Sequence, residues 1–424
     1  MRIAHFIQRY PPALGGSEAY CARLSRFLVN AGDHVSVFTS NAVALDAFWS
    51  RSGAVVPAAI GAEDGVKVRR YGLLRWPGRR YMLKPLSMIP HRLWQCLTLP
   101  CNPICPGMWR DAGRTDFSVE LVHASAFPYA FPIICARRLA RRLGVPFFLT
   151  PFLHLGDPAD PADRTRRSYL SPPLTWLLRE ADFIFVQTPS ERAAVLGLGI
   201  AAEKVVLQGL GVDPTECTGG DRQAARQMWG VAENDIVIGH LANLSREKGS
   251  TDLLIAFREL MERGVAAHLV LAGPAMPNFG AVWRTLEPSP RQRACIHRIG
   301  VLTDQQKRDF FAGIDIFALP SRSDSFGLVL LEAWANRKPV VAYRAGGIAD
   351  LVHDEQDGLL APCGAVVALA AALHRLCQSD TQRTNLGANG QARIDAEFRW
   401  PDKLELVRKT YQQALAFRNR SGAM

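Results

Sequence analysis

The sequence of 424 residues has no apolar run long enough to cross a membrane. Its longest candidate, Phe127 to Ala136, falls well short of the ~20 residues that a spanning helix needs, and it contains two prolines. The N-terminal MRIAHFIQRYPP has one early arginine and a short apolar run that ends at Gln8, which predicts a first strand and no signal peptide. We therefore expect a cytoplasmic protein without transmembrane helices.

Cysteine is present but follows no regular framework. Nine cysteines are an odd number, which indicates the reduced thiols of a cytoplasmic protein. Cys101 and Cys105, with Cys96 close by, could form one ligand pair of a metal site. No second pair with the spacing of a zinc finger or zinc ribbon follows them. The sequence therefore predicts free thiols, no metal and no cofactor.

Acidic residues are almost absent from residues 66–114, where ten lysines and arginines face the single carboxylate Asp111. Most of the net charge of +11 comes from this segment, because residues 208–424 have 25 Lys and Arg against 24 Asp and Glu. Trp76, Tyr81, Trp94 and several aliphatic side chains alternate with the bases, a mixture that suits an anionic membrane surface. Nucleic acid and an ordinary solvated insertion are the alternatives. No recognisable nucleic-acid module accompanies the bases, so we expect no nucleic-acid partner.

The spacing of apolar residues and glycines predicts two α/β halves. In the first half, the strand Ile3–Ile7 is followed by a glycine loop, a helix that ends at Gly32, and the strand His34–Ser40. This order is the opening unit of a doubly wound parallel sheet. The pattern restarts at Asp235 with the strand IVIGHL and the helix DLLIAFRELMERG. We expect domains at 1–207 and 208–400, a cleft between the carboxyl ends of their sheets, and a final helix at 401–424.

Two acids flank a strand-to-helix corner in the second half. In SDSFGLVLLEAWA, Asp324 lies at the mouth of the corner and Glu332 about two turns into the helix. If the helix begins near Ser325, the amides at 326–328 point outward, where they attract phosphate. Two carboxylates at this separation suit the hydroxyl pairs at opposite ends of one ligand. An aspartate cap followed by one buried, satisfied glutamate is the alternative.

Two other loops favour an anionic ligand. In NLSREKG, Lys248 and Gly249 lie between a predicted strand and a predicted helix, where a lysine can contact a diphosphate and a glycine leaves room for it. In the first half, LGGSE supplies the glycine turn Gly15–Gly16 before a helix, across the predicted cleft. Each feature alone also occurs in ordinary turns. Together with the corner they predict a two-sided clamp on a sugar nucleotide.

Several longer stretches carry a family resemblance: GGSEAYCARLSRFLVNAGDHVSVFT, QGLGVDP, NLSREKG, DIFALPSRSDSFGLVLLEAWANRKPVVAYRAGGIADLV, DGLLAP and FRWPDKLELVRKTYQQAL. On these the sequence resembles the retaining nucleotide-sugar glycosyltransferases of the GT-B fold, in particular the large family 4 group. The resemblance covers nearly the whole chain, is dense over residues 235–362 and is thin over 45–120. It implies two Rossmann-like, doubly wound parallel-sheet domains that face each other across a cleft, with the final helix crossing back to the first domain.

The resemblance also implies an activity. We expect a hexosyltransferase that moves a sugar from a nucleoside-diphosphate sugar to an acceptor hydroxyl, with retention and without a metal, since no DxD-type acid pair is present on an acceptor-side loop. The basic, aromatic segment adds the expectation of a lipid-linked or membrane-proximal glycan as acceptor, with the enzyme peripheral on the inner face of the membrane. A catalytically silent subunit of the same fold, which binds a partner or a membrane surface, is the alternative.

By position, the resemblance assigns the donor diphosphate to Lys248, the ribose hydroxyls to Glu332, and the donor-sugar hydroxyls near the anomeric centre to Asp324. His123 and His154, both at predicted strand ends, are candidates for a catalytic or donor-sugar role. The expected catalytic set is Lys248, Asp324, His123 and His154. The expected donor-binding set is Gly15, Gly16, Asn243, Lys248, Arg298, Gly300, Val301, Asp324, Ser325, Phe326, Gly327, Leu328 and Glu332.

Three positions depart from the family pattern. Asp324 replaces the usual glutamate and is shorter by roughly 1.5 Å, one C–C bond. Asn243 stands where the family often has an arginine, which removes a positive charge from the diphosphate site. Ser125 stands where the family often has a histidine. These departures are the reason for the silent-subunit alternative.

Overall fold

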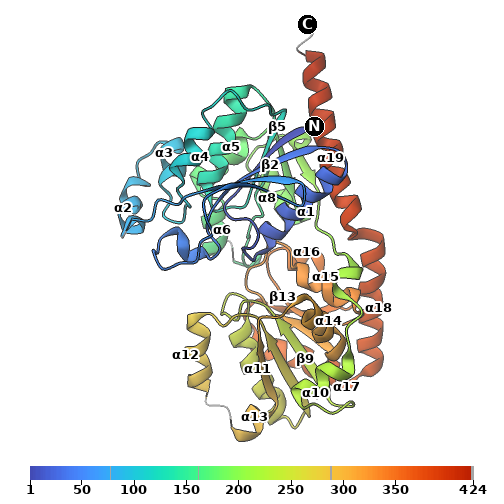
Figure 1. Cartoon of the computed structure of the whole chain (residues 1–424). Helices are drawn as coiled ribbons and strands as arrows, with labels where there is room; N and C mark the ends of the chain where they lie inside the picture. The colour runs from blue at the N-terminus through green and yellow to red at the C-terminus, as the bar shows by residue number, and fades with distance from the viewer. Residues whose placement is uncertain (77, 161, 287–288, 422–424) are drawn as a thin grey trace. The chain divides into compact units, whose positions relative to one another are not determined.

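The structure is a computed structural model that describes residues 1–76, 78–160, 162–286 and 289–421 (Figure 1). Pro77 of the basic segment and residues 422–424 of the expected final helix lie outside the described residues. The chain divides into two compact units. Unit 1 comprises Met1–Leu153, Arg166–Gln208 and Leu404–Met424, and unit 2 comprises His154–Thr165 and Gly209–Lys403. The segment His154–Thr165 belongs to unit 2, although the expected domain 1–207 contains it.

Unit 1 is built on an eight-stranded sheet with the order β3-β4-β2-β1-β5-β6-β7-β8. All neighbouring strands run parallel except β3 and β4. Burial on both faces explains why β1 is apolar along almost its whole length. The strands are β1 (Arg2–Ile7), β2 (His34–Ser40), β3 (Ile60–Glu63), β4 (Val66–Tyr71), β5 (Leu121–Ser125), β6 (Phe147–Thr150), β7 (Phe183–Val186) and β8 (Val205–Leu207).

The helices of unit 1 connect these strands. They are α1 (Gly16–Asn30), α2 (Arg79–Leu86), α3 (Arg92–Thr98), α4 (Pro106–Asp111), α5 (Ala130–Leu143), α7 (Pro172–Glu180), α8 (Pro189–Leu196) and the short 3-10 turns at Leu45–Phe48 and Ala202–Lys204. The helix α6 (Arg164–Tyr169) begins in unit 2 and ends in unit 1.

The last helix, α19 (Trp400–Ser421), contributes its residues from Leu404 onward to unit 1. Tyr411 of α19 packs edge-on against Phe148, at 4.7 Å between ring centres, and its hydroxyl lies 2.5 Å from His123 Nδ1. Arg408 of the same helix donates to Asp33 Oδ2 at 2.9 Å. Apolar and polar contacts therefore both hold this helix on unit 1.

Unit 2 has a six-stranded, wholly parallel sheet with the order β11-β10-β9-β12-β13-β14. Its strands are β9 (Ile236–Leu241), β10 (Ala267–Ala272), β11 (Ile296–Gly300), β12 (Ile316–Leu319), β13 (Val340–Arg344) and β14 (Gly358–Pro362). Its helices are α9 (Pro214–Cys217), α10 (Arg222–Trp229), α11 (Ser250–Glu262), α12 (Pro277–Leu286), α13 (Pro290–Ala294), α14 (Asp304–Gly313), α15 (Leu328–Ala335), α16 (Ile348–Leu351), α17 (Val366–Gln378) and α18 (Asp380–Glu397).

Each unit is thus a parallel-sheet α/β domain, and the predicted fold class is confirmed. The switch in strand order between β9 and β12 brings the loops after β9, β12 and β13 to one edge of the unit 2 sheet, where open α/β sheets bind ligands. Within the described ranges, none of the helices has both the length and the apolar character that a bilayer crossing requires.

Three histidines are buried in the two sheets: His5 and His123 in unit 1 and His240 in unit 2. His240 is hydrogen-bonded at both ring nitrogens, to the Ala318 carbonyl and to Ser250 Oγ, each at 2.8 Å. Burial lowers the pKa of His5 to about 3 and of His240 to about 4, and it lowers the pKa of His123 well below its ordinary value. The fold therefore holds all three imidazoles neutral.

This burial predicts that stability falls in mild acid. The unfolded chain takes up a proton at each histidine near pH 6.5 while the folded chain does not, so stability is complete above pH 6.5 and declines as the pH falls towards about 4. At a pH of about 5 we expect the free energy of unfolding, measured by urea denaturation, to be lower by about 2 kcal/mol for each buried histidine. His240→Gln should reduce the pH slope by the share of one histidine, whereas His91→Asn, at an exposed histidine, should leave it unchanged. A flat profile for the wild type would contradict the prediction.

Candidate active site

The corner between β12 and α15 carries the two predicted acids. The helix begins at Leu328, so the predicted start near Ser325 is wrong. Two local features delay it. Asp324 Oδ1 accepts the Phe326 amide at 3.2 Å, which holds the chain in a turn, and Gly327 is left-handed with φ 92°. The Phe326 amide is therefore engaged by Asp324, and the first helical residue is Leu328.

Lys248 and Asp324 form an ion pair at this corner. Lys248 Nζ lies 2.6 Å from Asp324 Oδ2, and the two side chains are 30% and 15% exposed. Burial alone would raise the pKa of Asp324, but the charge and hydrogen bond of Lys248 outweigh it, and the pKa lies below its ordinary value. Asp324 is thus an ionised carboxylate whose partner remains partly accessible, and its shorter side chain does not prevent the pair.

Backbone contacts fix Lys248 beside the corner. The Arg322 amide donates to the Glu247 carbonyl at 2.8 Å and joins the loop after β9 to the loop after β12. Gly249 is left-handed, with φ 71°, and a Cβ at this position would lie 1.8 Å from the Pro320 carbonyl oxygen. Only glycine allows this approach, so the KG dipeptide places the lysine by letting two loops touch.

The loop after β13 supports the same corner from another side. The Gly347 amide donates to the Asp324 carbonyl at 2.8 Å, and a Cβ on Gly347 would lie 2.0 Å from the Ser325 carbonyl oxygen. The neighbouring Gly346 amide donates to the Gly156 carbonyl at 2.7 Å. The segment His154–Thr165 is therefore attached to unit 2 next to the corner.

His154 completes the cluster. Its Nδ1 lies 3.3 Å from Ser323 Oγ. Burial lowers the pKa of His154 to about 4, the nearby Asp324 opposes this shift, and Lys248 adds to it. At neutral pH the imidazole is consequently uncharged, beside an ionised carboxylate and an ammonium. The structure thus brings together three of the four predicted catalytic residues: Lys248, Asp324 and His154.

Glu332 lies on α15 and pairs with a residue that the sequence analysis did not name. Lys307 Nζ of α14 is 2.5 Å from Glu332 Oε1, with side chains 31% and 21% exposed. The order of the elements could have indicated this pair, because α14 precedes β12 and α15 follows it. Neighbouring helices of this kind bring a lysine in the first half of α14 beside the glutamate of α15. The two predicted acids are therefore each paired with a different lysine, Asp324 with Lys248 and Glu332 with Lys307.

The remaining candidates of unit 2 follow the ends of β9 and β11. Asn243 is exposed directly after β9. On the edge strand β11, the Arg298 guanidinium lies over the rings of Phe279 and Trp283, at 5.6 and 5.7 Å. Gly300 ends β11, and Val301 after it is 59% exposed. These residues lie at or near the carboxyl edge of the sheet, and their donor-binding roles stay predictions.

Unit 1 holds the other candidates. Gly15 caps α1 and Gly16 is the first residue of that helix. The glycine turn is held by a buried ion pair that the sequence analysis missed: Arg9 lies 2.7 Å from Glu18 and also donates to the Leu14 carbonyl at 3.1 Å. The signal was available in the sequence, because Arg9 lies just after the first strand and the glutamate of GGSE lies in the first turn of the helix that follows the same loop.

His123 lies in the interior of unit 1. Its Nδ1 is 2.5 Å from the Tyr411 hydroxyl, and its Nε2 is 2.8 Å from Thr150 Oγ1. Both ring nitrogens therefore have partners from the same unit, and the ring is only 3% exposed. These contacts are those of a packed, satisfied histidine, and a catalytic role for His123 stays a prediction without support from its surroundings.

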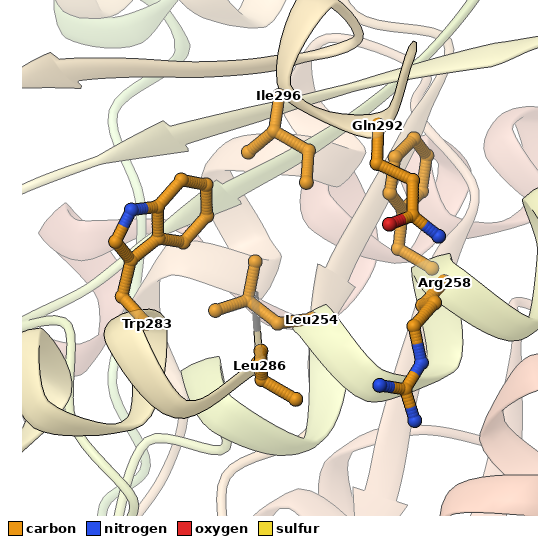
Figure 2. A pocket seen from close by; sticks show the side chains of 7 residues that line it. Leu254, Arg258, Trp283, Leu286, Gln292 and Ile296 are labelled. Atoms are coloured by element: carbon orange, nitrogen blue, oxygen red, sulfur yellow. The ribbon is translucent and has the colours of Figure 1, made fainter. Parts of the chain in front are cut away.

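A separate apolar pocket lies in unit 2 (Figure 2). Trp283 and Leu286 of α12, Leu254 and Arg258 of α11, and Ile296 contribute to its walls. Ile296 is the first residue of β11, so the pocket lies at the amino end of that strand, away from the edge that carries the corner. Among the described residues, no group of three or more His, Cys, Asp or Glu side chains is arranged to hold a metal ion.

Comparison with known proteins identifies the family. The profile described as "Glycosyl transferases group 1" matches residues 221–393, and that described as "Glycosyl transferase 4-like domain" matches residues 15–211. The D-inositol 3-phosphate glycosyltransferase of Kineococcus radiotolerans is 26% identical over 95% of this chain and 91% of its own length. The corresponding protein of Corynebacterium aurimucosum is 28% identical, and the match spans 57% of this chain and 59% of that protein.

Solved structures show the same fold. Sucrose-phosphate synthase from Thermosynechococcus elongatus superposes with a TM-score of 0.73 at 21% identity, over 98% of this chain and 99% of that one. HepE from Anabaena, solved with UDP and glucose, superposes with a TM-score of 0.70 at 20% identity, over 97% of this chain and 99% of that one. Since the two profiles match most of the chain, the protein belongs to the group 1 and 4-like glycosyltransferases of the GT-B fold, and the family and enzyme class predicted from the sequence are confirmed.

Proposed function

We propose that this glycosyltransferase transfers a hexosyl group from a nucleoside-diphosphate sugar to an acceptor hydroxyl, with UDP-glucose as the first donor to test. The observation that carries the proposal is the Lys248–Asp324 pair at the amino end of α15, beside neutral His154. A phosphate-binding cation, a helix start and a hydroxyl acceptor occur together at the sheet edge that binds ligands. The choice of UDP follows HepE, which was solved with UDP and glucose.

In the proposed reaction, the bond between the anomeric carbon and the diphosphate oxygen breaks, and the acceptor oxygen bonds to the anomeric carbon. Negative charge grows on the leaving diphosphate, which takes up the proton that the acceptor hydroxyl loses. Lys248 is ordered by Asp324 before any donor arrives, so its ammonium needs little rearrangement to stabilise that charge. The amino end of α15 adds a partial positive charge. Asp324 accepts donor-sugar hydroxyls, and His154, being neutral, provides a hydrogen bond without repelling the ammonium.

Glu332 accepts the two ribose hydroxyls in this proposal. Its carboxylate is held by Lys307, and a carboxylate has oxygens enough to accept hydrogen bonds from both hydroxyls. Lys307 is thus a positioning residue that acts through Glu332. We infer retention from the resemblance to retaining glycosyltransferases. We infer that no metal is needed, because protein groups can neutralise the leaving diphosphate. The acceptor is a lipid-linked or membrane-proximal glycan, on the strength of the basic and aromatic character of residues 66–114.

Removing the lysine should remove catalysis. We expect Lys248→Met to lower the rate of UDP release from UDP-glucose by about 10²- to 10³-fold, as for loss of one group that stabilises transition-state charge. Lys409→Met, an exposed lysine of α19, is the matched control and should keep full activity. Full activity of Lys248→Met would refute the assignment. Wild-type protein that binds UDP but turns over no nucleotide sugar would favour the silent subunit.

Lys307 should affect donor binding rather than chemistry. We expect Lys307→Met to raise KM for the donor about tenfold with little change in kcat, because ribose contacts are made equally in the ground and transition states. Lys307→Arg retains the charge and should restore KM. A fall in kcat with unchanged KM, or an equal loss in the arginine variant, would contradict the positioning role.

Retention and metal independence can be measured on one product. Proton NMR at early reaction times should show the anomeric configuration of the donor sugar preserved in the glycoside, and a chelator should leave the initial rate unchanged. An inverted product would refute retention. Loss of activity with chelator and its recovery with added Mg²⁺ would refute the metal-free mechanism.

A further inference from the structure

The exposed apolar side chains of unit 1 concentrate in one short segment. Between residues 76 and 94, seven large apolar side chains are exposed, with Tyr81 at 81% and Met88 at 76%. The seven are Trp76, Tyr81, Met82, Leu86, Met88, Ile89 and Trp94. Trp76 lies just before α2, and the other six come from α2, α3 and the turn between them, which we call the α2–α3 hairpin. A cluster of this kind on a soluble domain indicates an interaction surface.

The hairpin is anchored to unit 1 from beneath. Arg79, at the start of α2, is buried and donates to the carbonyl oxygens of Phe48 and Asn102, the latter at 2.8 Å. The Asn102 side chain in turn donates to the Cys96 carbonyl of α3 at 2.6 Å. The helix α3 also packs on α5 and α7. Because these contacts use the inner face, the apolar residues of the outer face remain exposed.

The structure narrows the surface that the sequence analysis assigned to residues 66–114. Two of the bases before the hairpin are engaged inside unit 1: Arg69 lies over the Phe117 ring at 5.0 Å, and Arg70 pairs with Glu63. After the hairpin, Cys105 and Met108 are fully buried. Lys67, Arg110 and Arg114 are exposed outside the hairpin, but the exposed large apolar side chains of residues 66–114 all lie between Trp76 and Trp94. Apolar and basic side chains are therefore exposed together only in that stretch.

Charge selects the partner. Lys84 and Arg92 are exposed among the apolar residues, and no Asp or Glu occurs between Asp64 and Asp111. Aromatic, methionine and aliphatic side chains next to bases are the composition of segments that lie in the interface of a membrane, with the rings and chains in the acyl boundary and the bases at the lipid phosphates. Nucleic-acid binding uses lysines, arginines and aromatic rings on which nucleobases stack. Four of the exposed side chains are neither basic nor aromatic and fit no such contact: Met82, Leu86, Met88 and Ile89.

We propose that the α2–α3 hairpin docks this protein on a bilayer that contains anionic lipids, with Tyr81, Met82, Met88 and Ile89 inserted at the interface. The inference deepens the proposed function, since it supplies a surface for a membrane-proximal acceptor. Docking itself needs no catalysis, so it is measured independently.

The test is sedimentation of the full-length protein with vesicles of phosphatidylcholine alone or mixed with phosphatidylglycerol. We expect binding to the mixed vesicles, and Tyr81→Ser with Met82→Gln and Met88→Gln should weaken it about tenfold or more. Lys84→Gln with Arg92→Gln should weaken binding to the mixed vesicles by a similar factor. Met228→Gln with Val367→Gln, which alters two exposed apolar residues of unit 2, is the matched control and should bind like the wild type.

Absence of vesicle binding, or an equal loss in the unit 2 control, would overturn the proposal, as would preferential binding to a DNA duplex or to a single strand. UDP release from UDP-glucose without vesicles is measured on the same preparations and should be unchanged in the hairpin variants. If docking fails while that activity persists, only the membrane inference is lost. If docking succeeds while the wild type turns over no nucleotide sugar, the proposed function fails instead.

Discussion

The ion pair between Lys248 and Asp324 is the interaction on which the rest of the candidate site depends. Both residues lie on loops that connect a strand to a helix: Lys248 on the loop after β9 and Asp324 on the loop after β12. Their 2.6 Å contact depends on a close approach of the two loops, which only a glycine at position 249 allows. The Gly347 amide also holds the Asp324 backbone through a hydrogen bond to its carbonyl. An ionised pair in a half-buried place needs each partner to compensate the other, so the loops and the charges stabilise one another.

His154 depends on the same pair. A protonated imidazole next to Lys248 would repel it, and burial already disfavours the proton, so the histidine stays neutral while Asp324 remains ionised. The cluster therefore combines one cation, one anion and one neutral hydrogen-bonding ring. That combination suits a donor with a charged diphosphate at one end and neutral hydroxyls at the other, because the charged and the neutral protein groups come from different loops.

Much of this could be predicted from the sequence, and the failures have local causes. Periodic apolar strands and glycine turns predicted both sheets, and the motif around Asp324 predicted the corner. The helix start was missed because the turn that Asp324 forms with the Phe326 amide and the left-handed Gly327 delay α15 by three residues. Helix propensity does not reveal that a side chain bonds to the backbone in place of the first helical turn. Lys307 was missed because it acts through Glu332, a partner that only the fold brings near. Arg9 is a different case, because its partner Glu18 is close in sequence and the pair could have been proposed from the loop alone. His123 shows the converse case. Thr150 and Tyr411, both distant in sequence, contact its two ring nitrogens, which the sequence does not reveal, and its catalytic role stays a prediction.

The basic segment illustrates why composition alone overestimates a surface. Counting charges over 66–114 treats every base as solvated, yet Arg69, Arg70 and Arg79 are used by an aromatic ring, a glutamate and two backbone carbonyls inside unit 1. What the fold leaves outside is a smaller set in which apolar area, not charge, predominates. On an anionic bilayer, a surface of that kind gains affinity mainly from insertion, with the bases selecting the sign of the lipid.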